Sequence, residues 1–217
     1  INLGISLEES GLINEAIDHY EVAKKCNPKN IDIFKNLGAL YLDSGQYENA
    51  IFEFENALTI NPNDDELNNN LGVSLRELGH FIEAKEYLKK SISINDQYSE
   101  AHYNLGFLYQ DIGSIDKAIV HFEKAISINN HSMSFHSLSY LKIFKKDDAL
   151  VIQMQDLLNS DKLNQVDKIH ICHAMANIHE KLNNHTEFFR YLDNANNLHK
   201  KELNYSHKAS KQEFRSY

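Results

Sequence analysis

The segment 31–64 reads IDIFKNLGALYLDSGQYENAIFEFENALTINPND, and its skeleton returns every 34 residues along the first half of the chain. All eight glycines occupy two positions of this period: Gly4, Gly38, Gly72 and Gly106, then Gly11, Gly45, Gly79 and Gly113. A third position carries Ala16, Ala50, Ala84 and Ala118. A fixed period of this length predicts an array of identical supersecondary units.

Each period predicts two helices. Apolar residues recur at helical spacing between Asp32 and Asp43, and Gly45 then offers the positive φ at which helices commonly stop. A second helix is expected over residues 48–60, because proline at position 62 disfavours helical geometry in the residue before it. Gly38 and Ala50 are small, which predicts that the two helices approach closely there.

The pattern resembles the tetratricopeptide repeat (TPR), whose motif runs W-x2-L-G-x2-Y, A-x3-F and P. The second repeat supplies the matching residues Phe34, Leu37, Gly38, Tyr41, Ala50, Phe54 and Pro62. Phe34 stands where the motif has Trp. The resemblance implies an all-α TPR superhelix, that is, an alpha-alpha solenoid of antiparallel helix pairs in which neighbours complete each other's core.

The expected organisation places four repeats over 1–30, 31–64, 65–98 and 99–132. A degenerate helix pair over 134–145 and 147–159, with a polar connection, fills 133–165. A degenerate last repeat follows at 166–204, with helices over 166–182 and 186–201, and Asn183 takes the place of the second glycine. Because the chain enters the pattern at Ile1, we expect a truncated first helix, and a basic segment, 205–217, leading to a missing domain.

The C-terminal half also resembles TPR-sulfotransferases. The matching stretches are Met154-Gln155-Asp156-Leu157-Leu158, Ala195-Asn196-Asn197-Leu198-His199-Lys200 and Leu203-Asn204-Tyr205. The resemblance implies a downstream domain that uses phosphoadenosine phosphosulfate, with a phosphate-cradling loop between a strand and a helix. No glycine follows Gly113, so we expect no such loop, no cofactor and no catalysis in this chain itself.

The composition of the chain limits the classes of partner that it can bind. The net charge of −9 disfavours general nucleic-acid binding, and no apolar run approaches the roughly 20 residues that a membrane helix needs. Cys26 and Cys172 are far apart and form no metal or redox motif, which favours a reducing, cytoplasmic compartment. A protein or peptide is therefore the expected partner.

The recurring Asn is the residue that the packing pattern does not require. Asn2, Asn36, Asn70 and Asn104 occupy one position of the first helix in each repeat. A carboxamide donates and accepts hydrogen bonds, so it can pair with a peptide backbone of any sequence. In the repeat family first helices line the concave surface. The four Asn are therefore predicted to form a ladder in a peptide-binding groove, similar to the ladder of O-linked N-acetylglucosamine transferases.

Acidic residues are predicted to flank this ladder on the same helical face. They are Asp32, Glu66 and Glu100 at one position, and Glu9, Asp43, Glu77 and Asp111 at another. Lys35 and Arg76 look isolated in this pattern, so the groove is expected to favour a basic or neutral extended polypeptide. Three readings remain open at this point: a stand-alone TPR adaptor, the substrate-recruiting arm of a sulfotransferase, and the arm of a glycosyltransferase.

Other chemistry is weakly signalled. His170, Cys172, His173 and His179 form the densest group of metal-ligand residue types, but only His170 and His173 share a helical face. No metal site and no catalytic residue are predicted. Paired acids such as Asp64-Asp65 lie at expected helix starts, where capping explains them.

Overall fold

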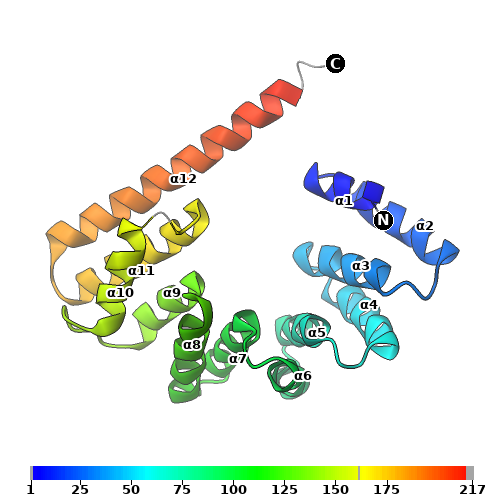
Figure 1. Ribbon diagram of the computed structural model, residues 1–217, viewed down its shortest axis with the longest axis horizontal. Coiled ribbons are helices and arrows are strands. Elements are labelled where there is room, and N and C mark those ends of the chain that lie inside the picture. Colours follow the sequence, from blue (N-terminus) through cyan, green and yellow to red (C-terminus); the bar gives the residue numbers. More distant parts are fainter. Residues whose placement is uncertain (1, 161, 214–217) are drawn as a thin grey trace. The chain divides into compact units, whose positions relative to one another are not determined.

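The computed structural model describes residues 2–160 and 162–213, with side chains except those of Asn2, Glu9 and residues 202–213. Over these residues the chain forms twelve helices and no strand, which confirms the predicted all-α solenoid class (Figure 1). It divides into two compact units, unit 1 over Ile1–Ser114 and unit 2 over Ile115–Tyr217. No helix in the described ranges is long and apolar enough to cross a membrane.

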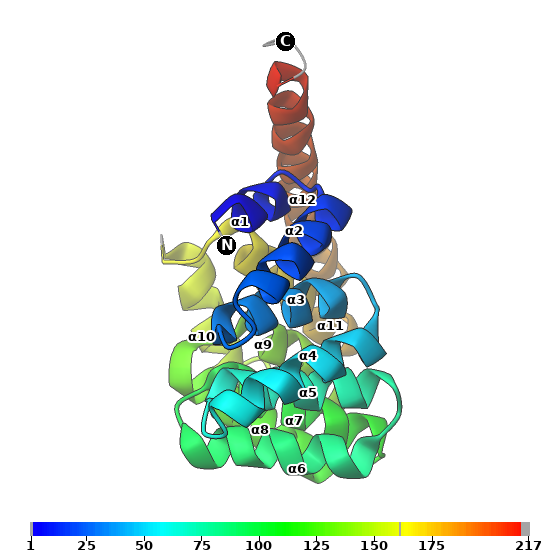
Figure 2. The same cartoon turned by 90° about the vertical axis from the view of Figure 1, so that its right-hand side faces the viewer.

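Unit 1 is a regular stack of antiparallel helices. Each helix packs against the next, and the first helices of successive repeats also touch: α3 contacts α5, and α5 contacts α7 (Figures 1 and 2). The helices are α1 (Asn2–Glu9), α2 (Ile13–Cys26), α3 (Ile31–Asp43), α4 (Tyr47–Ile60), α5 (Asp65–Glu77), α6 (Phe81–Ile94) and α7 (Ser99–Asp111).

Small residues set the spacing within each helix pair. A Cβ atom added at Gly38 of α3 would lie 2.4 Å from the ring of Phe54 on α4, closer than any relaxed contact allows. Both Ala50 and Phe54 are fully buried. The glycine predicted from the period is therefore required by helix packing.

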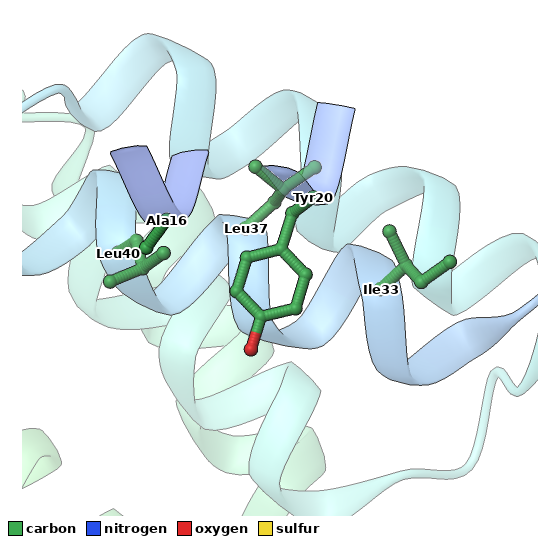
Figure 3. Close-up of a cluster of buried hydrophobic side chains, with 5 residues drawn as sticks. All are labelled: Ala16, Tyr20, Ile33, Leu37 and Leu40. Atoms are coloured by element: carbon green, nitrogen blue, oxygen red, sulfur yellow. The ribbon is translucent and has the colours of Figure 1, made fainter. Parts of the chain in front are cut away.

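The core between repeats is built by large side chains. Tyr20 and Ala16 of α2 pack against Ile33, Leu37 and Leu40 of α3, and Figure 3 shows the Tyr20 ring lying across this cluster. All five are buried. Removing such apolar area from water contributes about 25 cal/mol per Å², so this seam between the first two helix pairs stabilises unit 1.

Helix α3 ends as predicted. Gly45 has φ of +72°, its N–H donates to Leu42 O at 3.0 Å, and the N–H of Gln46 donates to Tyr41 O at 2.8 Å. This pair of bonds satisfies the last carbonyls of the helix, as a C-terminal glycine cap does elsewhere.

Unit 2 keeps the helix-pair design without glycine. Helix α9 packs against α8 and α11, and α11 also packs against α10 and α12. The helices are α8 (Ile115–Asn129), α9 (Ser132–Leu141), α10 (Ala149–Asn159), α11 (Gln165–Lys181) and α12 (His185–Glu213).

Two helix ends in unit 2 differ by more than two residues from the sequence prediction. The helix expected over 134–145 ends at Leu141, because Lys142 is extended and Phe144 is buried from a non-helical segment. The helix expected to stop at residue 201 continues to Glu213.

The last repeat packs around a different aromatic residue. Phe188, at a position where other repeats have alanine, is only half-buried and meets Phe189 with ring centroids 4.9 Å apart. The buried aromatic is Tyr191, which stacks on the buried His179 at 5.5 Å. The usual core aromatic position is held here by Leu192, which is only partly buried, and the adjacent Tyr191 is buried in its place.

Candidate functional site

The candidate site is the face of α3, α5 and α7 that carries Asn36, Asn70 and Asn104. All three side chains are partly buried. Apolar Ala39, Val73 and Phe107 lie one turn further along the same helices and are also partly buried. This face combines carboxamides with moderate apolar surface, and we name it the Asn face.

Asn36 is held by the preceding repeat. Its Nδ2 donates to the hydroxyl of Tyr20 at 3.0 Å, so the carboxamide of α3 is oriented by α2. Burial raises the pKa of the Tyr20 hydroxyl, while the Asn36 bond opposes that shift. Within the described residues Asn36 Oδ1 has no hydrogen-bond partner.

Asn70 and Asn104 are linked through Asn69. The Nδ2 of Asn104 donates to Asn69 Oδ1 at 2.9 Å, and the Nδ2 of Asn69 donates to Asn70 Oδ1 at 3.0 Å. Asn69 is 3 % exposed, so this relay connects α5 and α7 from inside. Asn70 Nδ2 and Asn104 Oδ1 have no partner in the described part of the chain.

Sequence reasoning missed Tyr20 and Asn69. Both orient predicted site residues, but Tyr20 follows the aromatic core pattern and Asn69 looks like a duplicate of its neighbour Asn70. The sequence held one indication for Asn69. The equivalent positions of the neighbouring repeats hold Lys35 and Tyr103, so this position is not part of the recurring packing pattern and its side chain can contact the adjacent helix.

The carboxylates of the Asn face divide into paired and unpaired groups. Asp32 and Asp43 are exposed and form no ion pair with any described residue. Glu100 accepts a bond from Ser99 Oγ at 2.8 Å. Burial raises the pKa of Tyr98 well above its ordinary value, and Glu100, Glu66, Asp65 and Asp64 raise it further, so carboxylates gather where α5 and α7 begin.

Lys35 and Arg76 are not isolated, contrary to the sequence interpretation. The Lys35 ammonium lies 2.7 Å from Glu66 and 3.6 Å from Asp64. Both carboxylates are close to this ammonium group because Lys35 on α3 faces the start of α5. Glu66, one of the acids predicted to flank the ladder, is therefore balanced by a cation from the neighbouring repeat, as is the capping residue Asp64.

Arg76 plays the same part between α5 and α7. It pairs with Glu77, lies 3.6 Å from Asp111, and places its guanidinium 4.6 Å from the centre of the Phe107 ring. Its side chain is only 12 % exposed. Burial raises the pKa of Asp111, and Arg76 counters that shift. This end of the Asn face is consequently less acidic than the sequence pattern indicated.

Asn2 and Glu9 lie on helix α1, but their side chains are outside the described residues, so the first step of the predicted ladder stays a prediction.

The histidine-rich part of α11 does not converge on one point. His170 lies 3.2 Å from Ser132 Oγ, His173 lies beside His136, and His179 stacks on Tyr191. Cys172 is buried, and burial raises the pKa of its thiol. The described residues contain no group of three or more residues able to hold a metal ion.

Ser132, Asp167 and His170 come together, although no catalytic set was predicted. Asp167 accepts a hydrogen bond from Ser132 and none from His170. A nucleophile–base relay needs the acid to orient the histidine, so this arrangement ties α9 to α11 and lacks the order of a catalytic triad.

Comparisons with known proteins agree with the repeats. A family model described as tetratricopeptide repeat matches residues 31–64 and 99–132, and a second of the same description matches 53–86. No curated protein matches the chain. The chain thus contains tetratricopeptide repeats.

Solved structures with the same fold include three at low identity. Pseudomonas aeruginosa pilF is 17 % identical with a TM-score of 0.67, covering 97 % of this chain and 95 % of its own. MamA is 21 % identical with a TM-score of 0.60, and the match covers 94 % of this chain and 98 % of MamA. YrrB, described as a TPR protein with an unusual peptide-binding site, is 18 % identical with a TM-score of 0.56, and the match covers 89 % of this chain and 90 % of YrrB.

Proposed function

We propose that the chain is a protein-interaction module whose Asn face binds an extended polypeptide. The observation that carries the proposal is that Asn36, Asn70 and Asn104 each keep one amide atom without a partner among the described residues, on successive first helices. YrrB, which shares the fold, is described as having a peptide-binding site, and this supports a peptide as the ligand class.

The chemistry of the free atoms suits a peptide backbone. Asn36 and Asn104 present oxygens that accept, and Asn70 presents an N–H group that donates. Every peptide unit offers both a donor and an acceptor, so such a row can bind a main chain whatever its side chains. Because Tyr20 and Asn69 hold these carboxamides in place, little side-chain entropy is lost on binding.

Charge sets the preferred side chains. Asp32 and Asp43 are exposed carboxylates of α3 without an ion pair in the described residues, while Arg76 neutralises its neighbours near the ends of α5 and α7. We therefore expect a basic or neutral peptide, with its basic residues near α3. Such a preference should weaken as salt screens the charges.

The finer proposal is that this module recruits substrate for a sulfotransferase. It is supported by the resemblance of the stretches 154–158 and 195–200 and by nothing else. Phosphoadenosine phosphosulfate would bind to the downstream domain implied by that resemblance. Reading the encoded sequence after Tyr217 tests it: a strand, a glycine-containing phosphate loop and a helix would support it.

The peptide proposal is tested by replacing the three carboxamides together, with Asn36→Ala, Asn70→Ala and Asn104→Ala. A peptide is first selected from a displayed random library against the unaltered chain, and its affinity is measured by fluorescence polarisation. Losing three hydrogen bonds should weaken binding about tenfold or more.

A second variant, Tyr20→Phe with Asn69→Ala, removes the same internal hydrogen bonds but leaves Asn36, Asn70 and Asn104 in place. Because Tyr20 and Asn69 orient these carboxamides, we expect it to bind more weakly than the unaltered chain and more tightly than the triple variant. Equal binding by the triple variant, with helicity intact by circular dichroism, would contradict the proposal.

A further inference from the structure

Unit 2 contains a cavity that the proposed function does not use. It has a volume of about 520 Å³ and lies among α10, α11 and α12. This is within the roughly 300–1,000 Å³ typical of small-ligand sites. The stretches 154–158 and 195–200 contribute lining residues, including Leu158 and Leu198, so the part of the chain that departs most from the repeat pattern forms its wall.

The lining is cationic. Lys168, Arg190 and Lys201 face the cavity, and no carboxylate is among its described lining residues. Arg190 pairs with Glu187 and lies 4.5 Å from the centre of the Tyr191 ring. The ammonium groups of Lys168 and Lys201 form neither an ion pair nor a hydrogen bond with any described residue.

Two other lysines of unit 2, Lys142 and Lys181, do have partners. Lys142 lies 2.9 Å from Glu123, and the Lys181 ammonium donates to two backbone oxygens at 2.7 and 2.9 Å. Two unpartnered cations that share one cavity repel each other. An anionic ligand would relieve that repulsion.

Carboxamides line the same cavity. Asn194 and Asn197 are one turn apart on α12 and make no side-chain hydrogen bond with the described residues. Gln155 of α10 is bonded to Tyr191, and Gln165 Nε2 donates to Leu198 O at 2.7 Å, which ties α11 to α12 beside the cavity. The wall is therefore fixed, while the two Asn amides stay available to a peptide backbone.

The spacing of the cations favours an extended ligand over a compact anion. Arg190 and Lys201 are both on α12, eleven residues apart. At 1.5 Å of rise per residue they are separated by about 16 Å along the helix axis, a distance that about five residues of extended chain would span. A single phosphate cannot reach both ends.

We propose that this cavity binds an acidic peptide segment of a partner protein, with side-chain carboxylates at Lys168, Arg190 and Lys201 and main-chain groups at Asn194 and Asn197. The site is separate from the Asn face of unit 1 and takes a ligand of opposite charge. It does not depend on the peptide proposal for unit 1, and each can fail alone.

The test uses the full chain and a labelled peptide in which glutamate alternates with alanine. The double variant Lys168→Glu and Lys201→Glu should weaken binding about tenfold or more, because it replaces two charge-assisted contacts with repulsion between like charges. The matched control, Lys145→Glu and Lys146→Glu, makes the same charge change on exposed lysines between α9 and α10. It should stay within about twofold of the unaltered chain.

Two further arms decide the ligand class. The same peptide with glutamine in place of glutamate should lose most of its affinity, and millimolar inorganic phosphate should displace the acidic peptide only as far as equal ionic strength of sodium chloride does. If the variant Lys168→Glu with Lys201→Glu bound the acidic peptide as tightly as the control Lys145→Glu with Lys146→Glu, the proposal would be overturned. Specific displacement by phosphate would overturn it in favour of a small phosphorylated ligand.

A neutral variant guards against misfolding. Lys168→Met with Lys201→Met removes the charges without adding like charges to the cavity, and its helicity is checked by circular dichroism. It should bind the acidic peptide more weakly than the unaltered chain and more tightly than the charge-reversed variant. Retention of full affinity by this folded variant would contradict the assignment.

Discussion

The two units of the chain build the same helix pair from different residues. Unit 1 holds all eight glycines and carries 8 basic and 19 acidic residues; unit 2 holds no glycine and carries 14 basic and 12 acidic residues. Because both still form stacked antiparallel helices, the architecture depends on which positions are small or left-handed rather than on glycine itself. The charge difference shows that the shared fold presents two different surfaces.

The largest expected effect concerns the close approach of paired helices. Gly38→Ala places a Cβ atom 2.4 Å from the buried Phe54 ring and should reduce the free energy of unfolding by about 2–3 kcal/mol, the cost of overpacking a core. At the equivalent position unit 2 already carries Ala176, which is buried. Ala176→Gly should cost only about 1 kcal/mol of helix propensity.

Urea unfolding followed by circular dichroism checks both variants against the unaltered chain. If Gly38→Ala is no less stable than Ala176→Gly, the view that close packing requires glycine in unit 1 is wrong.

A smaller effect is expected at the helix ends. Asn183 ends α11 with φ of +55°; its N–H donates to Glu180 O at 2.9 Å, and Asn184 N–H donates to His179 O at 2.9 Å. This repeats the bonds around Gly45 in unit 1. Asn183→Ala should cost about 1 kcal/mol, because alanine lacks the tolerance of asparagine for left-handed geometry.

Exchanging the residues at the ends of α3 and α11 tests whether Gly45 and Asn183 are equivalent helix caps. Gly45→Asn should cost less than Gly45→Ala, and Asn183→Gly should leave stability unchanged or slightly raised. Thermal unfolding of the four variants gives the order directly; a tolerated alanine at either position would show that the left-handed residue is not what fixes the helix end.

Much of the fold was predictable because its determinants are local and periodic. Glycine at 38 and 45 indicates close packing and a left-handed turn, and Asn183 was identified as the equivalent of the second glycine from its place in the degenerate last repeat. The end of α9 was missed because Leu138, Leu141 and Phe144 continue a helical spacing, although Phe144 is buried from an extended segment.

The site was less predictable. Sequence indicated where Asn36, Asn70 and Asn104 lie on their helices, but not that Tyr20 and Asn69 hold them, nor that Lys35 and Arg76 pair with acids of the next repeat. Those contacts join side chains from different repeats, and their partners depend on how the helices pack. The cavity of unit 2 was not predicted for the same reason, because its walls combine side chains of three helices, α10, α11 and α12.

The smallest effect we expect separates the units by pH. In unit 2 burial lowers the pKa of His136, His173 and His179 below the ordinary value of 6.5. The unfolded chain then binds protons near pH 6.5 while the folded unit does not. Unit 2 should therefore lose stability as the pH falls from about 6.5 toward the folded pKa values.

Unit 1 should respond in the opposite direction. Burial raises the pKa of the Glu53 carboxyl, which is 2 % exposed, and its bond with Lys24 only partly offsets this. The folded unit thus takes up a proton before the unfolded chain does. The resulting stability is full below the ordinary glutamate pKa of 4.5 and is lost as the pH rises through the raised folded value.

Hydrogen exchange read peptide by peptide separates the two responses, once rates are corrected for the intrinsic pH dependence of exchange. As the pH falls from about 7.5 to about 5.5, protection from exchange should fall in α9 and α11 and hold or rise in α2 and α4.

His179→Phe keeps an aromatic ring against Tyr191 but cannot be protonated, so it should reduce the loss of protection in α11 and leave protection in α2 unchanged. The effect should be modest, because only His179 of the three is fully buried, and neither of its ring nitrogens is hydrogen-bonded to a described residue. Equal acid sensitivity in both units would mean that their stability is not set by these buried groups.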